Sequence, residues 1–230
     1  MSPRVFVTGA TGYVGRHVIP VLLNRGHRVA ALVRSGSESK APSGCDIVIG
    51  DPFDRWTFVT AIAPGDTVLQ LVGVPRPSPA KAQQFLDIDL QSARESIAAA
   101  SATEVGHFVY VSVAQPAPVM LAYQAARRHA EQMLVSSGLR HTILRPWYVL
   151  GPGHRWPYAL LPIYWLMERL PGTRESARRL GLVTLPQMVA AIVEAIESPP
   201  QSARVVEVPE IRRAGKAGRA GKAGWENTAV

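Results

Sequence analysis

The chain has 230 residues, of which 47% are hydrophobic, enough for the core of one globular domain and too many for a disordered protein. Its formal net charge is +8, but the basic residues are spread over many segments, so nucleic-acid binding is not expected. No apolar run approaches the roughly 18 residues that span a bilayer, and a single cysteine, Cys45, excludes an internal disulfide framework. We expect a cytoplasmic protein, since the first apolar strand begins too early to follow a signal peptide.

Strand and helix signals alternate along most of the chain. The apolar runs that indicate strands cover residues 4–8, 29–33, 46–49, 67–72, 108–113 and 141–144. The helical patterns between them cover residues 13–25, 53–62, 81–102 and 123–136. Later segments predict helices near 159–169 and over 186–197, and a last strand at 204–208. This alternation predicts an α/β fold with a doubly wound parallel sheet, in which ligands bind at the carboxyl ends of the strands.

A glycine-rich turn follows the first predicted strand. Gly9 allows a tight turn, Gly12 lets the backbone approach a pyrophosphate, and Gly15 lets the next helix pack on the strand. The start of that helix would offer free N–H groups and the positive end of its dipole to the phosphates. The motif therefore predicts a dinucleotide site formed by Gly9, Thr11, Gly12, Tyr13, Val14 and Gly15. The alternative is a glycine-rich turn that binds nothing.

The end of the second strand bears on the choice of dinucleotide. NAD sites usually place an acidic residue there to hold the ribose 2′-hydroxyl, whereas this chain has Arg34. A guanidinium suits a 2′-phosphate, so we expect NADP(H) to be preferred over NAD(H). The alternative is a solvated arginine in a loop.

Other cofactor contacts are expected where later strands end. Asp51, beside Pro52, could accept a hydrogen bond from the adenine amino group, or it could instead cap the following helix. The remaining positions expected along the cofactor are Leu71, Val72, Gly73, Val111 and Pro146.

Together these pieces resemble the short-chain dehydrogenase/reductase superfamily, in its atypical, NmrA-like branch of NAD(P)-binding Rossmann and epimerase/dehydratase-like proteins. The matching segments are residues 8–15, 32–34, 50–51, 108–112 and 144–146, with Tyr123 and the helix that follows it. The resemblance extends to about residue 209. It implies one NAD(P)-binding Rossmann domain over 1–209, with a small substrate lobe mainly from 147–183. Residues 210–230, which contain a Gly/Ala/Lys repeat, are expected to form a disordered basic tail.

The resemblance also implies a catalytic triad. In catalytic members a Ser orients the substrate carbonyl, a Tyr donates the proton, and a Lys four residues later lowers the pKa of that Tyr. The matching positions hold Ser112, Tyr123 and Arg127, so arginine replaces the lysine. Arginine keeps the positive charge, but the geometry of its donors differs. The alternatives are that Tyr123 is a packing residue, that Ser112 bonds only the cofactor amide or the local backbone, and that Arg127 is a surface charge.

The segment after the sixth strand is rich in aromatic residues. Trp147, Tyr148 and Trp156 are expected to wall an apolar substrate pocket beside the nicotinamide, or else to pack the lobe onto the sheet. The six histidines show no spacing typical of metal ligands, so no metal site is expected.

These features favour an NADP(H)-dependent oxidoreductase that moves hydride between the nicotinamide and a small apolar carbonyl, enone or quinone. One alternative is a non-catalytic NAD(P)-binding redox sensor or accessory subunit, and another is a nucleotide-sugar epimerase or dehydratase. The expected partner is a small-molecule substrate, with no nucleic acid and no membrane span, and the protein is expected to be a monomer or a homodimer.

Overall fold

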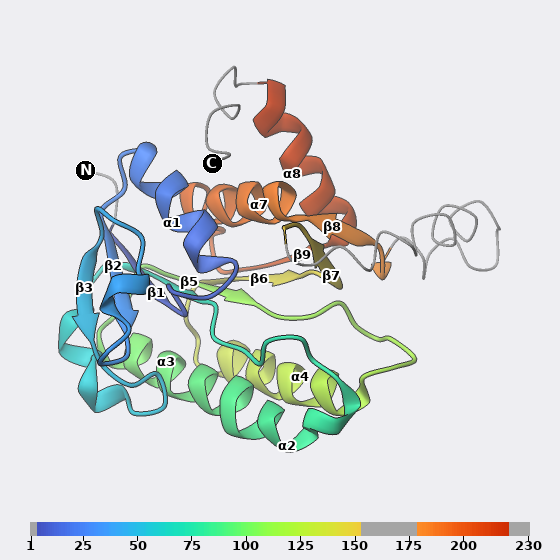
Figure 1. Ribbon diagram of the computed structural model, residues 1–230, viewed down its shortest axis with the longest axis horizontal. Coiled ribbons are helices and arrows are strands. Elements are labelled where there is room, and N and C mark those ends of the chain that lie inside the picture. The colour runs from blue at the N-terminus through green and yellow to red at the C-terminus, as the bar shows by residue number, and fades with distance from the viewer. Residues whose placement is uncertain (1–3, 153–178, 221–230) are drawn as a thin grey trace.

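The computed structural model describes residues 4–152 and 179–220 (Figure 1). Within these residues a central sheet of seven parallel strands has the order β3-β2-β1-β4-β5-β6-β9. The strands are β1 (Val5–Thr8), β2 (Val29–Val33), β3 (Asp46–Ile49), β4 (Thr67–Gln70), β5 (His107–Val111), β6 (His141–Arg145) and β9 (Ala203–Glu207). The strand order reverses between β1 and β4, which marks the switch point where such sheets bind ligands. The predicted doubly wound parallel sheet is confirmed.

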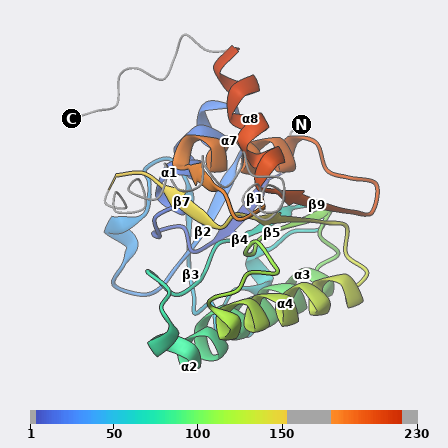
Figure 2. The ribbon, with the colours of Figure 1, turned by 90° about the vertical axis from the view of Figure 1, so that its right-hand side faces the viewer.

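Helices cover both faces of the sheet (Figures 1 and 2). One face carries α1 (Gly15–Asn24) and α7 (Leu185–Glu197), with α8 (Val208–Ala220) packed on α7. The other face carries α3 (Gln91–Ala102) and α4 (Leu121–Ser136), preceded by the short α2 (Ala82–Gln84) and the π-helical turn η5 (Phe85–Leu90). Two clusters of buried apolar side chains lie between the sheet and these helix layers.

The burial of the strands follows their place in the sheet. All five residues of β2 are buried, as its unbroken apolar run predicts for a strand covered on both faces. In contrast, β3 lies at the edge, and Ile47 and Ile49 are 42% and 48% exposed. The core is therefore centred on β1, β4 and β5, whose carboxyl ends carry the predicted site.

A second, smaller sheet lies beyond β6. Its strands, β7 (Tyr148–Leu150) and β8 (Leu182–Thr184), pair in parallel. Thr184 then caps α7, because its Oγ1 accepts the Gln187 N–H while its own N–H donates to Gln187 Oε1 at 2.8 Å. This pairing ties the segment after β6 to the start of α7. The helix expected near 159–169 lies outside the described residues.

Two of the expected helices are less regular than the sequence predicts. Residues 53–62 form two short 3-10 turns, η2 (Arg55–Thr57) and η3 (Val59–Ala61), rather than one helix. The Asp54 side chain accepts the Trp56 N–H at 3.1 Å, and such bonds compete with a regular helix. The helix expected over 81–102 is interrupted by η5. Two further 3-10 turns are η1 (Glu38–Lys40) and η4 (Pro79–Lys81).

A disordered tail is expected from residue 210, but the structure differs, because residues 208–220 form α8. Val208 and Ile211 lie one helical turn apart and are fully buried. A Cβ at Gly215 would lie 2.5 Å from Gln187 Cγ, so the glycine permits a close approach to α7. Small residues that suggest a flexible tail in the sequence therefore allow α8 to pack on α7. Regular structure continues past residue 209, where the predicted domain ends.

Candidate functional site

The glycine turn packs directly against the end of β4. Gly9 has a φ of +74°, and a Cβ there would lie 2.9 Å from both Leu71 C and Val72 N. A Cβ at Gly15 would lie 2.5 Å from the Gly9 carbonyl oxygen, and the Gly12 N–H donates to that same oxygen at 3.0 Å. The roles predicted for Gly9 and Gly15 thus correspond to contacts that only glycine allows.

The start of α1 is suited to an anion. Val14 is its N-cap, no side chain caps the helix, and its first turn carries no acidic residue. The amide groups of this turn and the positive end of the helix dipole therefore face the loop that contains Thr11 and Gly12 without competition from a carboxylate. The Tyr13 ring stacks edge-on against His17, with centroids 5.4 Å apart, and its hydroxyl lies against Gly151. Tyr13 thereby joins the glycine turn to the end of β7.

Gln70 holds the end of β4 in place. Its Oε1 accepts hydrogen bonds from Thr8 Oγ1 and from the Val72 N–H, the latter at 3.0 Å. Its Nε2 donates to Ser92 Oγ at 3.1 Å, and Gln70 is fully buried. This network is not among the features expected from the sequence, although a glutamine that ends an apolar strand is a visible signal. Its effect is to fix the backbone of Leu71 and Val72, two expected cofactor contacts, against the glycine turn.

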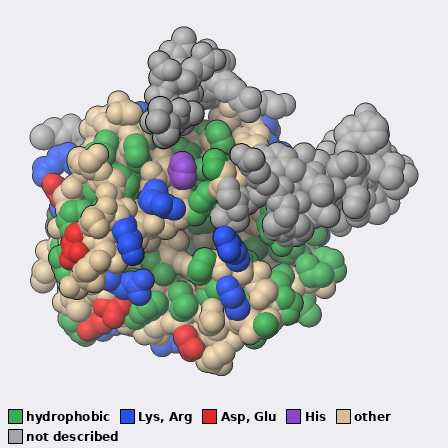
Figure 3. All heavy atoms as spheres, viewed as in Figure 1, with side chains coloured by type: hydrophobic (Ala, Val, Ile, Leu, Met, Phe, Trp, Pro, Cys, Tyr) green, Lys and Arg blue, Asp and Glu red, His purple; other side chains and the backbone are tan. Residues whose placement is uncertain are grey.

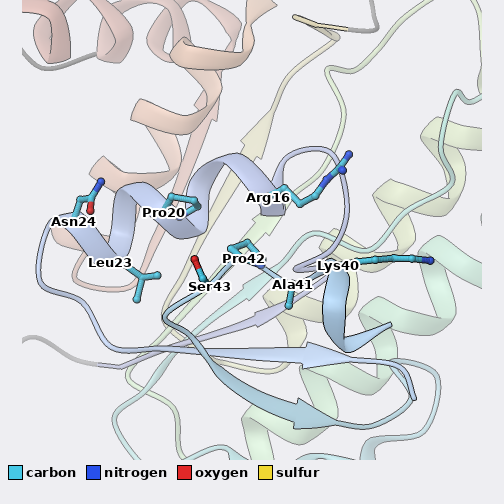
Figure 4. A pocket seen from close by; sticks show the side chains of 8 residues that line it. All are labelled: Arg16, Pro20, Leu23, Asn24, Lys40, Ala41, Pro42 and Ser43. Carbon is cyan, nitrogen blue, oxygen red and sulfur yellow. The ribbon is translucent and has the colours of Figure 1, made fainter. Parts of the chain in front are cut away.

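The expected adenosine end is rich in cations. Arg34 is exposed just beyond β2, and its side chain makes no hydrogen bond or ion pair within the described residues. Arg16 and Lys40, which the sequence analysis did not single out, point the same way at the glycine-loop end of α1 (Figure 4). A space-filling view shows Lys and Arg side chains following one another across this part of the surface (Figure 3). Together they create a positive potential beside β2 that suits an anion.

Arg16 and Lys40 also line a shallow cavity of about 420 Å³ between α1 and the segment that follows η1. Its other lining residues are Pro20, Leu23, Asn24, Ala41, Pro42 and Ser43 (Figure 4). The cavity extends along the side of α1, away from the switch point, so only its cationic end can serve the predicted cofactor.

Asp51 has a structural partner in the described residues. Its Oδ1 accepts the Phe53 N–H at 2.9 Å, which is a local turn contact. It is not the helix cap that we considered beside an adenine contact, because Asp54 caps the following turn, η2. Pro52 is buried next to it, whereas Asp51 itself is exposed. The carboxylate is therefore already partly engaged by the backbone that follows.

Ser112 lies just beyond β5 and is only 3% exposed. Its N–H donates to the Leu144 carbonyl at 2.8 Å, and Ala114 N–H donates to Pro146 O at 2.9 Å, which brings the ends of β5 and β6 together. Its Oγ is buried and makes no hydrogen bond to any residue that the structure describes. A buried hydroxyl without a partner carries a free-energy cost, so this atom is suited to bond a ligand.

Tyr123 and Arg127 lie one turn apart on α4, as their spacing predicts. The Arg127 guanidinium carbon lies 5.2 Å from the centroid of the Tyr123 ring, which also packs on Phe85 at 4.9 Å. Arg127 Nη2 pairs with Asp89 Oδ1 at 2.5 Å, and Nη1 donates to Val111 O at 2.9 Å. The arginine is therefore bonded to the protein on two sides.

Burial raises the pKa of the Tyr123 phenol, although the nearby Arg127 acts in the opposite direction. Burial also raises the pKa of Tyr110, whose hydroxyl accepts from Arg127 at 3.3 Å, to about 12. Both phenols therefore stay protonated at neutral pH. Tyr123 can serve as a proton donor but is not poised as a tyrosinate.

The aromatic segment after β6 is only partly described. Trp147 packs against the core cluster on the α1 and α7 face, and its ring meets Tyr148 edge-on with centroids 5.8 Å apart. For Trp147, this packing agrees with the alternative role that we considered. Trp156 lies outside the described residues.

No group of three or more His, Cys, Asp or Glu side chains in the described ranges could hold a metal ion. Likewise, none of the helices described is long and apolar enough to cross a membrane.

Comparisons with known proteins agree with this geometry. Residues 9–155 match the model of a protein family described as NAD(P)H-binding. A solved short-chain dehydrogenase/reductase superfamily protein from Agrobacterium tumefaciens, with bound NAD, has a TM-score of 0.64 at 20% identity, covering 89% of this chain and 77% of that one. At this identity the likeness shows the fold.

Two curated relatives are named as reductases. The 3-diazoavenalumate denitrifying reductase of a Streptomyces species is 29% identical over 224 residues, which cover 85% of this chain and 72% of that protein. The divinyl chlorophyllide a 8-vinyl-reductase of Zea mays is 29% identical over 157 residues, which cover 62% of this chain and 39% of that protein. Proteins named as epimerases are also among the matches.

Proposed function

This chain belongs to the NAD(P)H-binding family, and from that premise we propose that it is an NADP(H)-dependent oxidoreductase of the atypical short-chain type. The observation that carries the proposal is the glycine turn, where a Cβ at Gly9 would collide with the backbone of Leu71 and Val72, and where no side chain caps the start of α1. Such a turn allows a pyrophosphate to approach the amide groups closely.

The preference for NADP(H) is supported by charge. Arg34 follows the end of β2, beside the expected ribose 2′ position, and Arg16 and Lys40 lie at the glycine-loop end of α1 (Figure 4). Within the described residues none of these three side chains is neutralised by an ion pair. A phosphate there would gain charge-assisted hydrogen bonds, whereas a 2′-hydroxyl offers no negative charge to these cations.

We place the substrate over the ends of β4 and β5. When bound, NADPH supplies a hydride to an electrophilic carbon of the substrate. The unpartnered Ser112 hydroxyl would hold the carbonyl oxygen, and the protonated Tyr123 phenol would donate its proton to that oxygen. With Trp147, Tyr148 and Trp156 in the flanking segment, we propose a small apolar carbonyl, enone or quinone as substrate.

Calorimetry and turnover assays test this function. We expect the folded protein to bind NADPH more tightly than NADH, and to consume NADPH with some members of a panel of carbonyls and quinones. Arg34→Ala should weaken NADPH binding by about tenfold and leave NADH binding nearly unchanged. If neither coenzyme binds, the proposed function is wrong.

A non-catalytic NAD(P)-binding protein is the second candidate. It is favoured by the state of Tyr123, because burial raises the pKa of its phenol more than Arg127, which is paired with Asp89 and bonded to Val111, lowers it. Tight NADPH binding without turnover across the panel, together with an unchanged NADPH affinity in Tyr123→Phe, would support this second candidate.

A further inference from the structure

A buried ion pair lies beneath the carboxyl ends of β4 and β5. Arg127 and Asp89 are 6% and 0% exposed, and Arg127 Nη2 lies 2.5 Å from Asp89 Oδ1. The two rings of Tyr110 and Tyr123 flank the guanidinium at 5.7 Å and 5.2 Å. The pair is thus shielded from water. In such a buried pair the Coulomb attraction is little screened, and removing one partner is strongly destabilising.

The pair reaches both strand ends. On the β4 side Asp89 Oδ2 accepts the Val74 N–H at 3.1 Å, and a Cβ at Gly73 would overlap Arg127 Nη2. On the β5 side Arg127 Nη1 donates to the Val111 carbonyl at 2.9 Å. The pair therefore connects the Gly73–Val74 backbone to the end of β5.

Asp89 can reach this position because of the π-helical turn η5. The residues before and after it belong to helices on the sheet face, while Asp89 itself is fully buried beneath the β4 loop. An extra residue in a helical turn changes the direction of the side chains that follow it, and such turns are frequent at functional sites.

The place of the pair relative to a dinucleotide follows from the topology. The adenosine half is expected beside β2, near Arg34, and the pyrophosphate at the start of α1, which follows β1. The nicotinamide half must then extend over the strands on the other side of β1, namely β4 and β5. The Gly73–Val74 backbone and the Val111 carbonyl lie at those two ends.

We propose that Arg127 and Asp89 are positioning residues. Their buried ion pair fixes the spacing between the ends of β4 and β5, and so shapes the binding site of the nicotinamide half. Arg127 does not act as the ribose-binding cation that a lysine at this position would supply, because its two Nη atoms are bonded to Asp89 and Val111. This role rests on the proposed function, since it concerns the same nucleotide site.

The test compares two ligands. NADP⁺ occupies both halves of the site, whereas 2′,5′-ADP occupies only the adenosine half. We expect Asp89→Asn to weaken NADP⁺ binding by about tenfold and to leave 2′,5′-ADP binding unchanged. Arg127→Lys should do the same, because one ammonium group cannot bond Asp89 and Val111 O together in the geometry of a guanidinium.

A matched control lies at the opposite end of β4. Asp66 precedes this strand, is 5% exposed, and pairs with Arg4 at 2.7 Å. Asp66→Asn breaks an arginine–aspartate pair that is partly buried, and it should lower stability. The ratio of the dissociation constants of NADP⁺ and 2′,5′-ADP should stay as in the unchanged protein. If Asp89→Asn does not fold, the double variant Asp89→Leu with Arg127→Met removes both charges and restores a packed pair of similar size.

The outcomes separate the two proposals. If the unchanged protein binds neither ligand, the proposed function fails and the positioning role fails with it. If it binds both, and the Asp89 and Arg127 variants weaken both ligands alike or neither, only the positioning role is overturned. A selective loss of NADP⁺ binding in these variants, absent from Asp66→Asn, supports it.

Discussion

Replacing Gly9 with alanine tests the close approach between the glycine turn and β4. The added Cβ faces two costs, because Gly9 has a φ of +74° and the methyl group would lie 2.9 Å from Leu71 C and Val72 N. The left-handed conformation costs a non-glycine residue about 1–2 kcal/mol, and overpacking against rigid backbone costs roughly 1–3 kcal/mol. We therefore expect Gly9→Ala to lower the free energy of unfolding by about 2–5 kcal/mol.

Gly26 provides the matched control. It has a φ of +84°, but nothing lies within 4 Å of the position that a Cβ would take. Gly26→Ala should therefore incur only the conformational cost, about 1–2 kcal/mol. For a chain of this size, Tm falls by roughly 2–4 °C for each kcal/mol lost from the free energy of unfolding. The two variants should therefore differ clearly in Tm.

Thermal unfolding and NADP⁺ titration are measured on both variants. Gly9→Ala should also weaken NADP⁺ binding, because the turn must move away from Leu71 and Val72, whereas Gly26→Ala should bind as the unchanged protein does. Equal losses of Tm in the two variants would show that the contact with β4 does not constrain the turn. Unaltered NADP⁺ affinity in a folded Gly9→Ala protein would remove the turn from the nucleotide site.

Three further predictions concern single side chains. Burial lowers the pKa of His107 to about 4, so the unfolded chain binds more protons than the folded chain as the pH falls below about 6.5. The free energy of unfolding should therefore decrease by about 3 kcal/mol between pH 6.5 and pH 4. Urea titrations of His107→Gln should show a smaller decrease over this pH range. Burial raises the pKa of Tyr110 to about 12. The free energy of unfolding should therefore decline from about pH 10 upward, because the phenol ionises in the unfolded chain before it does so in the folded one. Tyr110→Phe should reduce the decline between pH 9 and pH 11. Ser112→Ala removes a buried hydroxyl that has no partner among the described residues, so we expect it to leave Tm unchanged or slightly higher while lowering turnover, and a clear loss of Tm would contradict this view.

The sequence predicts the fold well because the signals that determine the fold are local. The bounds expected for β2 and β3 agree with the structure, since apolar runs between turn residues identify buried strands. Local sequence signals fail where a side chain competes for backbone hydrogen bonds, as Asp54 does at η2. They also fail where a small residue allows close packing instead of a turn, as Gly215 does in α8. In these cases the outcome depends on contacts with distant segments.

The candidate site divides in the same way. The glycine turn is visible in the sequence because its requirements concern neighbouring residues and backbone shape. The partners of these site residues are not visible, because they lie far along the chain. Gln70 acts through a hydrogen bond with Thr8, and Asp89 acts through an ion pair with Arg127. A polar residue inside an apolar pattern indicates that a partner exists, but it does not identify that partner.

Arg127 illustrates the consequence for function. From sequence alone, an arginine in place of a lysine reads as a weakened catalytic pair that keeps its charge. In the structure that charge faces Asp89, with both Nη atoms engaged and Gly73 leaving the space that the guanidinium fills. A lysine could not make these contacts at once, so Asp89, Gly73 and Arg127 fit one another as a set. The substitution is therefore better explained as the exchange of a ribose ligand for a structural connection between two strand ends than as the decay of an active site.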